Sequence, residues 1–227
     1  MEDFVYSPPP PETAPGASPV LFENEAIVVC DKPAGLLSVP GRLPAHKDSL
    51  YARLLSQDRP ELKVVHRLDL ATSGLIVFAK GLAANRALSR QFQQRQVQKR
   101  YSAIVAGVPA DSAGCVDLPL ICDWPNRPRQ MVDHSLGKPS QTQWTRGQTR
   151  TVGGVQACSM ALTPLTGRSH QLRVHMAALG HPILGDGLYA PASAQAASHR
   201  LLLHAQWLEF EDPLTGERRA FTAPCPF

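Results

Sequence analysis

The sequence lacks any long apolar run. No segment approaches the roughly 20 apolar residues that a membrane helix needs, and the N-terminus has no basic segment followed by an apolar one. We therefore expect a cytoplasmic protein with no membrane partner. With 43% hydrophobic and 19% charged residues, the composition is that of an ordinary globular protein.

Signatures of disulfide scaffolds, metal sites and nucleotide cofactors are also missing. The five cysteines are odd in number and include no Cys-x-x-Cys pair. No Gly-x-Gly-x-x-Gly and no Gly-x-x-x-x-Gly-Lys occurs. His170, His175 and His181 form the densest histidine run, but no Glu lies between them, so a metal hydrolase is disfavoured. We expect the other histidines, including His66 and His204, to be hydrogen-bonded structural residues.

Positive charge is present in moderate excess. The net charge of +4 and the pI near 8.9 are compatible with a polyanionic partner, although many basic proteins bind no nucleic acid. The densest basic cluster starts on a predicted helix over residues 82–96, where Arg86 and Arg90 share a face, and it continues through Arg95, Lys99 and Arg100. Such a cluster is either a solvated helix face or a surface that follows the phosphates of a polyanionic partner.

Hydrophobic periodicity and turn residues outline the elements. Residues 1–19 are rich in proline and are expected to be a flexible arm, so that one folded domain spans residues 20–227. We predict helices starting after Asp48 or Ser49 and ending by Pro60, at 82–96 and at 171–179, and strands at 21–22, 27–30, 64–65, 75–79, 101–106, 155–162, 201–210 and 218–222. Residues 109–150 alternate turn signals with polar stretches, and Gly147, Gly153 and Gly154 interrupt strand character. Strands without regular βαβ alternation indicate the α+β class.

Residues 64–80 are the stretch around which the chain is organised. Their pattern is strand, loop, strand, and Asp69 lies on the loop. An Asp in such a place is commonly a surface or turn-capping residue. Arg67, two positions earlier, supplies a cation beside it, and loops held between strands often carry catalytic groups.

Ordered motifs extend from residue 32 to residue 186. They are residues 32–35, His66-Arg67-Leu68-Asp69 with Thr72-Ser73-Gly74-Leu75, and residues 99–101, 167–175 and 180–186. Together they resemble the signature of the RluA-type pseudouridine synthases. A narrower resemblance, to members of the family that act on both rRNA and tRNA, is carried by residues 35–42 and 117–128.

The resemblance implies a pseudouridine synthase fold, with a mixed, mostly antiparallel sheet, flanking helices and a central catalytic cleft. It implies an isomerase that converts uridine to pseudouridine in large-subunit (23S) rRNA and in tRNA anticodon stem-loops, and that flips the target base out of its stack. The isomerisation is neither redox chemistry nor group transfer to a second molecule, so no cofactor and no metal are expected. We also expect a monomer, without a separate N-terminal RNA-binding domain.

The resemblance further assigns roles to residues. Asp69 would be catalytic, either adding covalently to the nucleotide or removing a sugar proton. Tyr101, otherwise a packing residue of a strand, would stack on the target base. Arg173 lies beside a buried helix stripe and needs a carboxylate, for which Asp69 is the expected partner. The expected RNA-binding residues are Arg67, Arg86, Arg90, Lys99, Arg100, Trp124, Arg127, Arg129, Arg168 and His170.

Two alternatives remain open at this point. The segment from Trp124 to Arg129 reads equally as an ordinary loop or as an aromatic and arginine pair for unpaired RNA. The whole chain could also be a non-catalytic RNA-binding or rRNA-assembly module on the same fold. That alternative is disfavoured because Asp69, Tyr101 and Arg173 are all present, and a pure binder has no evident need for an acidic loop facing phosphates.

Overall fold

The structure is a computed structural model that describes residues 20–57, 59 and 61–227. The predicted N-terminal arm and Pro60 lie outside the described residues. The described chain divides into two compact units, which we call the Asp69 unit (residues 20–99 and 204–226) and the Arg173 unit (residues 100–203 and 227). The boundaries fall inside two strands, β5 (Gln98–Ala106) and β11 (Leu203–Glu211). The expectation of a single catalytic domain over residues 20–227 stays a prediction.

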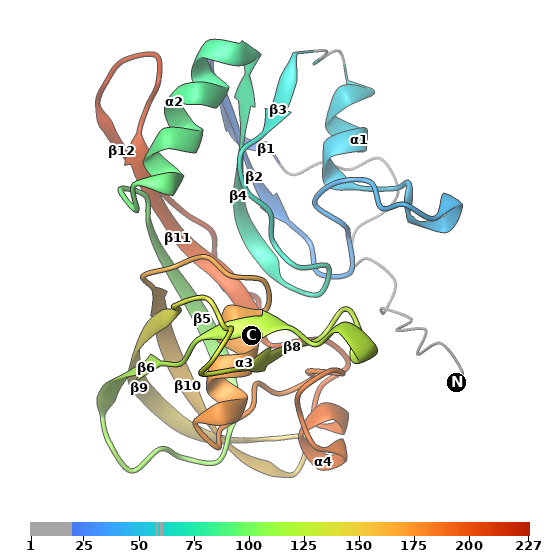
Figure 1. The fold of residues 1–227 in the computed structure, drawn as a ribbon, viewed down its shortest axis with the longest axis vertical. Helices are drawn as coiled ribbons and strands as arrows, with labels where there is room; N and C mark the ends of the chain where they lie inside the picture. The colour runs from blue at the N-terminus through green and yellow to red at the C-terminus, as the bar shows by residue number, and fades with distance from the viewer. Residues whose placement is uncertain (1–19, 58, 60) are drawn as a thin grey trace. The chain divides into compact units, whose positions relative to one another are not determined.

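A mixed sheet forms the body of the Asp69 unit (Figure 1). Its elements are β1 (Val20–Glu23), β2 (Ile27–Lys32), α1 (Leu50–Leu55), β3 (Leu62–Val64), β4 (Ser73–Lys80), α2 (Gly81–Gln93) and β12 (Arg218–Thr222), together with β11. β4 is central: β2 and β3 pair with it in antiparallel orientation, and β11 runs parallel to its first residues. β1 and β12 pair in antiparallel orientation with β2 and β11.

Burial explains why β4 occupies the centre. Its residues from Ser73 to Ala79 are all buried, as expected for a strand covered on both faces. On one face Leu75 and Val77 join a core cluster that includes Leu88 of α2 and Phe210 of β11. This packing holds the start of β4, and therefore the loop before it, in one place.

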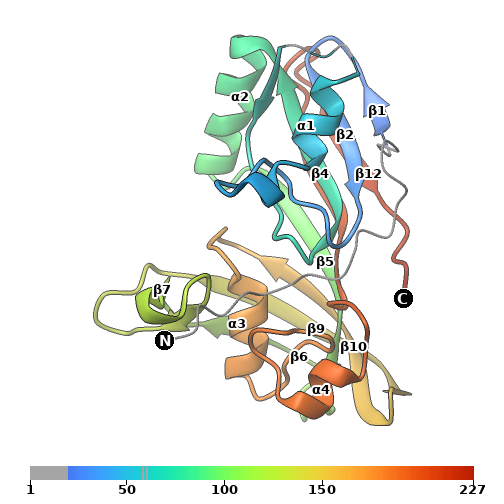
Figure 2. The same ribbon diagram turned by 90° about the vertical axis from the view of Figure 1, so that its right-hand side faces the viewer.

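The sheet of the Arg173 unit is antiparallel, and its strand order is β5, β10, β9, β6. Its elements are β6 (Ala113–Asp117), β7 (Leu120–Cys122), the 3-10 turn η2 (Trp124–Asn126), β8 (Gln130–Val132), β9 (Gln141–Val152), β10 (Val155–Pro164), α3 (Gln171–Ala178) and α4 (Ala192–Ala196). β7 and β8 form a separate hairpin. α3 packs against β8, β9 and β10 and can be followed beside these strands in Figure 2.

The strand pairing inside the two units confirms the α+β class and the mixed, mostly antiparallel sheet with flanking helices. Most of the predicted elements are present with small shifts of their ends. Ser49 is the N-cap of α1, where its side chain accepts a hydrogen bond from the Ala52 amide, and α1 ends at Leu55. The prediction was incomplete for residues 109–150, which contain β6, β7, β8 and most of β9.

The expectation that glycines interrupt strand character is confirmed for Gly153 and Gly154 and was wrong for Gly147. Gly153 and Gly154, at φ 55° and 78°, form a two-residue turn between Val152 and Val155, which pair with each other. Two positive φ angles are what a tight hairpin turn with the right-handed twist requires. Gly147 lies inside β9, where a side chain would place its Cβ 2.5 Å from Ser159 Oγ, next to a register shift in β10. It marks a bulge with close strand approach, not the end of a strand.

Candidate active site

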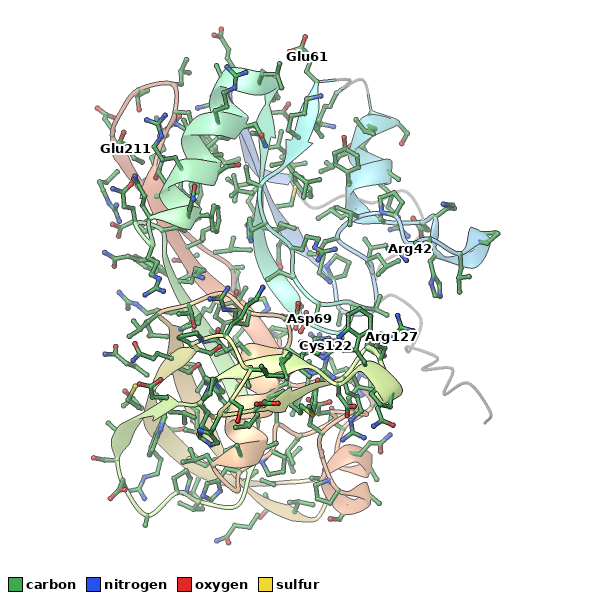
Figure 3. The ribbon with its side chains drawn as sticks, in the orientation of Figure 1. Arg42, Glu61, Asp69, Cys122, Arg127 and Glu211 are labelled. Carbon is green, nitrogen blue, oxygen red and sulfur yellow. The ribbon has the colours of Figure 1, made fainter. Side chains whose placement is uncertain are left out.

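Asp69 lies in the connection between β3 and β4, residues 65–72, and is half-buried. In Figure 3 its carboxylate is at the end of the Asp69 unit where β4 begins, whereas Glu61 lies near the start of α2. This is the loop between two strands that the sequence predicts.

Hydrogen bonds fix the backbone on both sides of Asp69. Ser38 Oγ accepts from the Leu68 amide at 3.1 Å and donates to the Leu68 carbonyl at 2.8 Å. The Leu70 carbonyl accepts from the Gly35 amide at 3.0 Å, and the Asp69 carbonyl accepts from the Thr72 amide at 3.1 Å. Three consecutive carbonyls are therefore held, which limits the directions that the Asp69 side chain can take.

Lys32 adds further hydrogen bonds to the backbone around Asp69. Its side chain has no exposed surface, and its ammonium donates to the carbonyls of Pro33, Leu36 and Leu70 at 2.9, 2.8 and 3.2 Å. An ammonium has three protons, so each finds an acceptor. Sequence reasoning assigned no function to Lys32, Gly35 or Ser38, although all three lie in motif segments that carry the resemblance.

His66 is a hydrogen-bonded structural residue, as predicted. Its Nε2 accepts from the Val77 amide at 3.0 Å, and its ring stacks on Phe92 with centroids 4.6 Å apart. Burial, together with the positive charge of Lys99, lowers the pKa of His66 to about 3. The imidazole is therefore neutral at pH 7 and can act as an acceptor at Nε2.

The predicted RNA-binding residues of this unit differ in exposure. Arg67, Arg86 and Arg90 are exposed, and none of them has a partner among the residues that the structure describes. Lys99 is half-buried, and desolvation lowers the pKa of its ammonium. The three arginines are therefore the more accessible of the predicted RNA-binding residues in this unit.

In the Arg173 unit, Arg173 is 3% exposed and its guanidinium forms a two-pronged pair with Asp186. Its Nε and Nη2 donate to the two carboxylate oxygens at 2.8 and 2.6 Å. One of those oxygens also accepts from the amides of Leu188 and Tyr189. Arg173 does need a carboxylate, as reasoned from burial, but sequence reasoning missed Asp186 in this role. Pairing of Arg173 with Asp69 stays a prediction.

Tyr189 contacts several of the predicted site residues through its hydroxyl and its ring. Its hydroxyl accepts from the Gln130 amide at 2.8 Å and lies 2.7 Å from His170 Nδ1. The guanidinium carbons of Arg173 and Arg129 lie 5.1 and 5.5 Å from the centre of its ring. Tyr189 was not predicted as a site residue, and its only sequence signal is its place three residues after the motif that ends at Asp186.

The other predicted residues of the Arg173 unit are mostly at the surface. Trp124, in η2, is 65% exposed, and Arg127 lies over its ring at 4.9 Å. Arg100 and Arg168 are exposed. Tyr101 is half-buried on β5, where it pairs with Leu162 of β10.

The histidines of the disfavoured metal site make separate contacts. His170 bonds Tyr189, His175 lies between Thr142 and the Leu118 carbonyl, and His181 bonds the Ala106 carbonyl. In residues 20–57, 59 and 61–227 no group of three metal-binding side chains is gathered. Over the same part of the chain no helix is long and apolar enough to cross a membrane.

Comparisons with known proteins agree on the family. The family model described as RNA pseudouridylate synthase matches residues 26–178. The dual-specificity RNA pseudouridine synthase RluA of Escherichia coli K12 is 51% identical over 208 residues, covering 92% of this chain and 93% of the relative. The protein of the same name from Vibrio vulnificus is 55% identical over 210 residues, covering 92% and 83%.

Solved structures show the same fold. Human RNA pseudouridylate synthase domain containing 1 superposes with a TM-score of 0.79 at 27% identity, covering 95% of this chain and 86% of that one. Human RNA pseudouridylate synthase domain containing 4 gives a TM-score of 0.72 at 26% identity, covering 92% and 88%. The chain therefore has the pseudouridine synthase fold and belongs to the RluA-type RNA pseudouridine synthases, which makes it an isomerase that acts on RNA.

Proposed function

We propose that the chain isomerises uridines in two kinds of RNA, 23S rRNA and the anticodon stem-loop of tRNA. Support comes from the dual-specificity name of relatives that are about half identical to this chain, and from the motifs at residues 35–42 and 117–128. The reaction breaks the bond from the sugar to N1, turns the base and forms a bond to C5. It calls for no redox partner, so we propose that it proceeds without a cofactor or metal.

Asp69 is the proposed catalytic carboxylate. The observation that carries this assignment is the framework of Lys32, Gly35 and Ser38, which holds the backbone on both sides of Asp69. A reacting group has to be held within a fraction of an ångström of its productive position, and backbone bonding of this kind supplies that precision. Both chemical routes, covalent addition and proton abstraction followed by elimination, use an ionised Asp69.

Tyr101 and Arg173 are proposed to act with Asp69 on the target nucleotide. The ring of Tyr101 would stack on the extruded base. Arg173 is already fixed by Asp186 and by the face of Tyr189, so it would present a rigid cation. An opposite charge within about 4 to 6 Å favours the ionised form of a carboxylate.

Base flipping is proposed as the way the uridine reaches Asp69. Extrusion costs a few kcal/mol of stacking and pairing. Arg67 is exposed, has no partner in the described chain and lies two residues from Asp69, so its planar guanidinium can fill the vacated place in the stack. The wider RNA contacts would come from the exposed cations Arg86, Arg90, Arg100, Arg127, Arg129 and Arg168, with Lys99, His170 and Trp124.

The test is tritium release from RNA labelled at uridine C5. Purified wild-type protein, Asp69→Asn and the exposed control Asp111→Asn are each assayed with a 23S rRNA fragment and an anticodon stem-loop transcript. We expect release by the wild type and the control, and a loss of at least about a thousandfold in Asp69→Asn with RNA affinity within about twofold, because the reacting carboxylate is removed while the RNA contacts stay.

Other outcomes would overturn parts of the proposal. Activity retained by Asp69→Asn would remove Asp69 from its catalytic role. Release from one RNA alone would exclude dual specificity. If none of the proteins releases tritium from either RNA and binding is retained, the non-catalytic RNA-binding reading would replace the proposal.

A further inference from the structure

Tyr189 links two parts of the Arg173 unit that are proposed to act on the RNA. One part is α3, which carries Arg173. The other is the β7–β8 hairpin, residues 120–132, which contains β7, η2 and β8. Tyr189 follows α3 in the sequence, is half-buried and contacts both parts, through its ring and through its hydroxyl.

The turn that carries Tyr189 is built around the carboxylate that binds Arg173. Asp186 Oδ1 accepts from the amides of Leu188 and Tyr189 at 2.9 and 3.2 Å. The same carboxylate accepts both hydrogen bonds from the Arg173 guanidinium. Asp186 is 1% exposed, so one buried side chain fixes Tyr189 and Arg173 relative to each other.

The ring of Tyr189 limits the movement that Asp186 leaves to Arg173. Two hydrogen bonds to one carboxylate hold the guanidinium along one edge, but they still permit it to tilt out of its plane. The Arg173 guanidinium carbon lies 5.1 Å from the centre of the Tyr189 ring, and a cation is attracted to an aromatic face at such a distance. The ion pair and the ring together therefore define both the position and the tilt of the guanidinium.

The hydroxyl of Tyr189 joins the hairpin to the start of α3. Its oxygen accepts from the amide of Gln130, the first residue of β8, at 2.8 Å. It also lies 2.7 Å from Nδ1 of His170, the N-cap residue of α3. A phenol oxygen can accept one hydrogen bond and still donate or accept another, so one hydroxyl serves both partners. His170 has φ 53°, a left-handed conformation that residues other than glycine rarely adopt, and the contact with Tyr189 helps to hold it there.

A second cation, from the hairpin, lies on the same ring. The guanidinium carbon of Arg129 is 5.5 Å from the ring centre, and Arg129 directly precedes Gln130. The Arg129 carbonyl accepts from the Asp123 amide at 3.0 Å, which closes the turn that contains Trp124. Tyr189 therefore contacts the hairpin next to the turn that exposes Trp124 to solvent.

We propose that Tyr189 is a positioning residue of the isomerase, which couples the β7–β8 hairpin to the orientation of Arg173. This inference rests on the proposed function, in which Arg173 acts with Asp69 and the hairpin contacts RNA. Without the coupling, RNA on the hairpin would not be held at a fixed place relative to the Arg173 guanidinium, and binding would also have to order the hairpin. Tyr189 acts through Arg173 and the hairpin, and it touches no reacting atom.

The experiment compares Tyr189→Phe, Tyr189→Leu and the control Tyr51→Phe by steady-state tritium release from the anticodon stem-loop transcript. Tyr189→Phe keeps the ring and loses the hydroxyl, so we expect KM to rise about fivefold, the effect of one lost hydrogen bond, with kcat within about twofold. Tyr189→Leu also loses the aromatic face, so kcat should fall by about tenfold. The hydroxyl of Tyr51 donates to the Leu62 carbonyl at 2.9 Å in the Asp69 unit, and Tyr51→Phe should keep both kinetic constants.

A double-mutant cycle with Arg173→Lys separates positioning from a general loss of stability. Lysine keeps the charge but can neither form the two-pronged pair nor stack its planar group on the ring. If Tyr189 acts through Arg173, Tyr189→Leu should lower kcat by less than about twofold in the Arg173→Lys background. Equal losses in the two backgrounds would overturn the proposal, as would wild-type kinetic constants for Tyr189→Leu.

Hydrogen exchange followed by NMR gives a reading that does not depend on activity. We expect the Gln130 amide to exchange about tenfold faster in Tyr189→Phe than in the wild type. The Arg173 Nε proton should exchange faster in Tyr189→Leu or, if that variant does not fold, in Tyr189→Met. Unchanged exchange at both positions would overturn the coupling. Inactive wild-type protein would overturn the proposed function instead, and the exchange rates would still decide whether Tyr189 couples the hairpin to Arg173.

Discussion

At the scale of single residues, the position of Asp69 depends on side chains that do no chemistry. Ser38 is the clearest of them, because one buried hydroxyl satisfies both the amide and the carbonyl of Leu68. Leaving buried backbone groups unpaired costs about 1 to 3 kcal/mol.

We therefore expect Ser38→Ala to lower the free energy of unfolding by about 1 to 3 kcal/mol and to lower kcat more than it changes KM. Urea unfolding and tritium release measure the two effects. Ser56→Ala is the matched control, because that exposed hydroxyl bonds only the Arg53 carbonyl at the end of α1, and it should cost less than about 0.5 kcal/mol. A destabilised Ser38→Ala enzyme with unchanged kcat would limit Ser38 to a purely structural role.

At the scale of elements, the parallel pairing of β4 with β11 restricts which residue type can occupy position 74, the second residue of β4. Gly74 pairs with Ala205, its φ is +107°, and an added Cβ would lie 2.4 Å from the Ala205 carbonyl oxygen. Backbone atoms cannot swing aside as a flexible side chain can. The motif residue after Ser73 is therefore glycine for reasons of packing as well as of backbone conformation.

We predict that Gly74→Ala destabilises the protein by more than about 3 kcal/mol, the combined effect of a strained φ and a displaced strand. Gly180→Ala is the control, since Gly180 has φ +87° but nothing within 4 Å of the added Cβ. Thermal unfolding of both variants separates the two contributions. Equal losses would mean that backbone strain alone accounts for the effect and that β11 yields.

At the scale of the whole molecule, stability should fall on acidification before the ordinary carboxylates titrate. The pKa of His66 is lowered from 6.5 to about 3, so between these values the unfolded chain binds a proton that the folded chain does not. Stability from this group is complete above about pH 6.5 and declines as the pH falls toward 3, by at most about 1.4 kcal/mol per pH unit. Burial also lowers the pKa of His175, which acts in the same direction.

The measurement is the free energy of unfolding by urea at several pH values from 8 to 4.5, for the wild type and His66→Gln. Glutamine can still accept from the Val77 amide but does not titrate, so the variant should show a weaker dependence on pH between 6.5 and 4.5. Below about pH 4.5 protonation of Glu23 adds a further loss, because its hydrogen bond with Arg59 holds its pKa near 2. Parallel curves for the two proteins would show that His66 titrates normally.

Local patterns in the sequence determined much of what surrounds Asp69. The apolar residues at 64–65 and 75–79 predict strand, loop and strand, and Asp48 or Ser49 before Leu50 predicts the start of a helix, which Ser49 caps. These features depend on residues a few positions apart, whose periodicity or capping chemistry is written in the chain. The ordered motifs likewise determined the family, which the comparisons confirm.

Only the tertiary structure decided which distant groups meet. Ser38 bonds Leu68 across thirty positions, and Gln130 reaches Tyr189 across fifty-nine. The position of Arg173 on a helix with a buried face predicts that it pairs with a carboxylate. No neighbouring residue in the sequence indicates that Asp186 is this partner. Contacts of this kind depend on how separate elements pack, and no period of two or 3.6 residues records them. The sequence shows which residues are charged or polar, whereas the tertiary structure decides which of them pair.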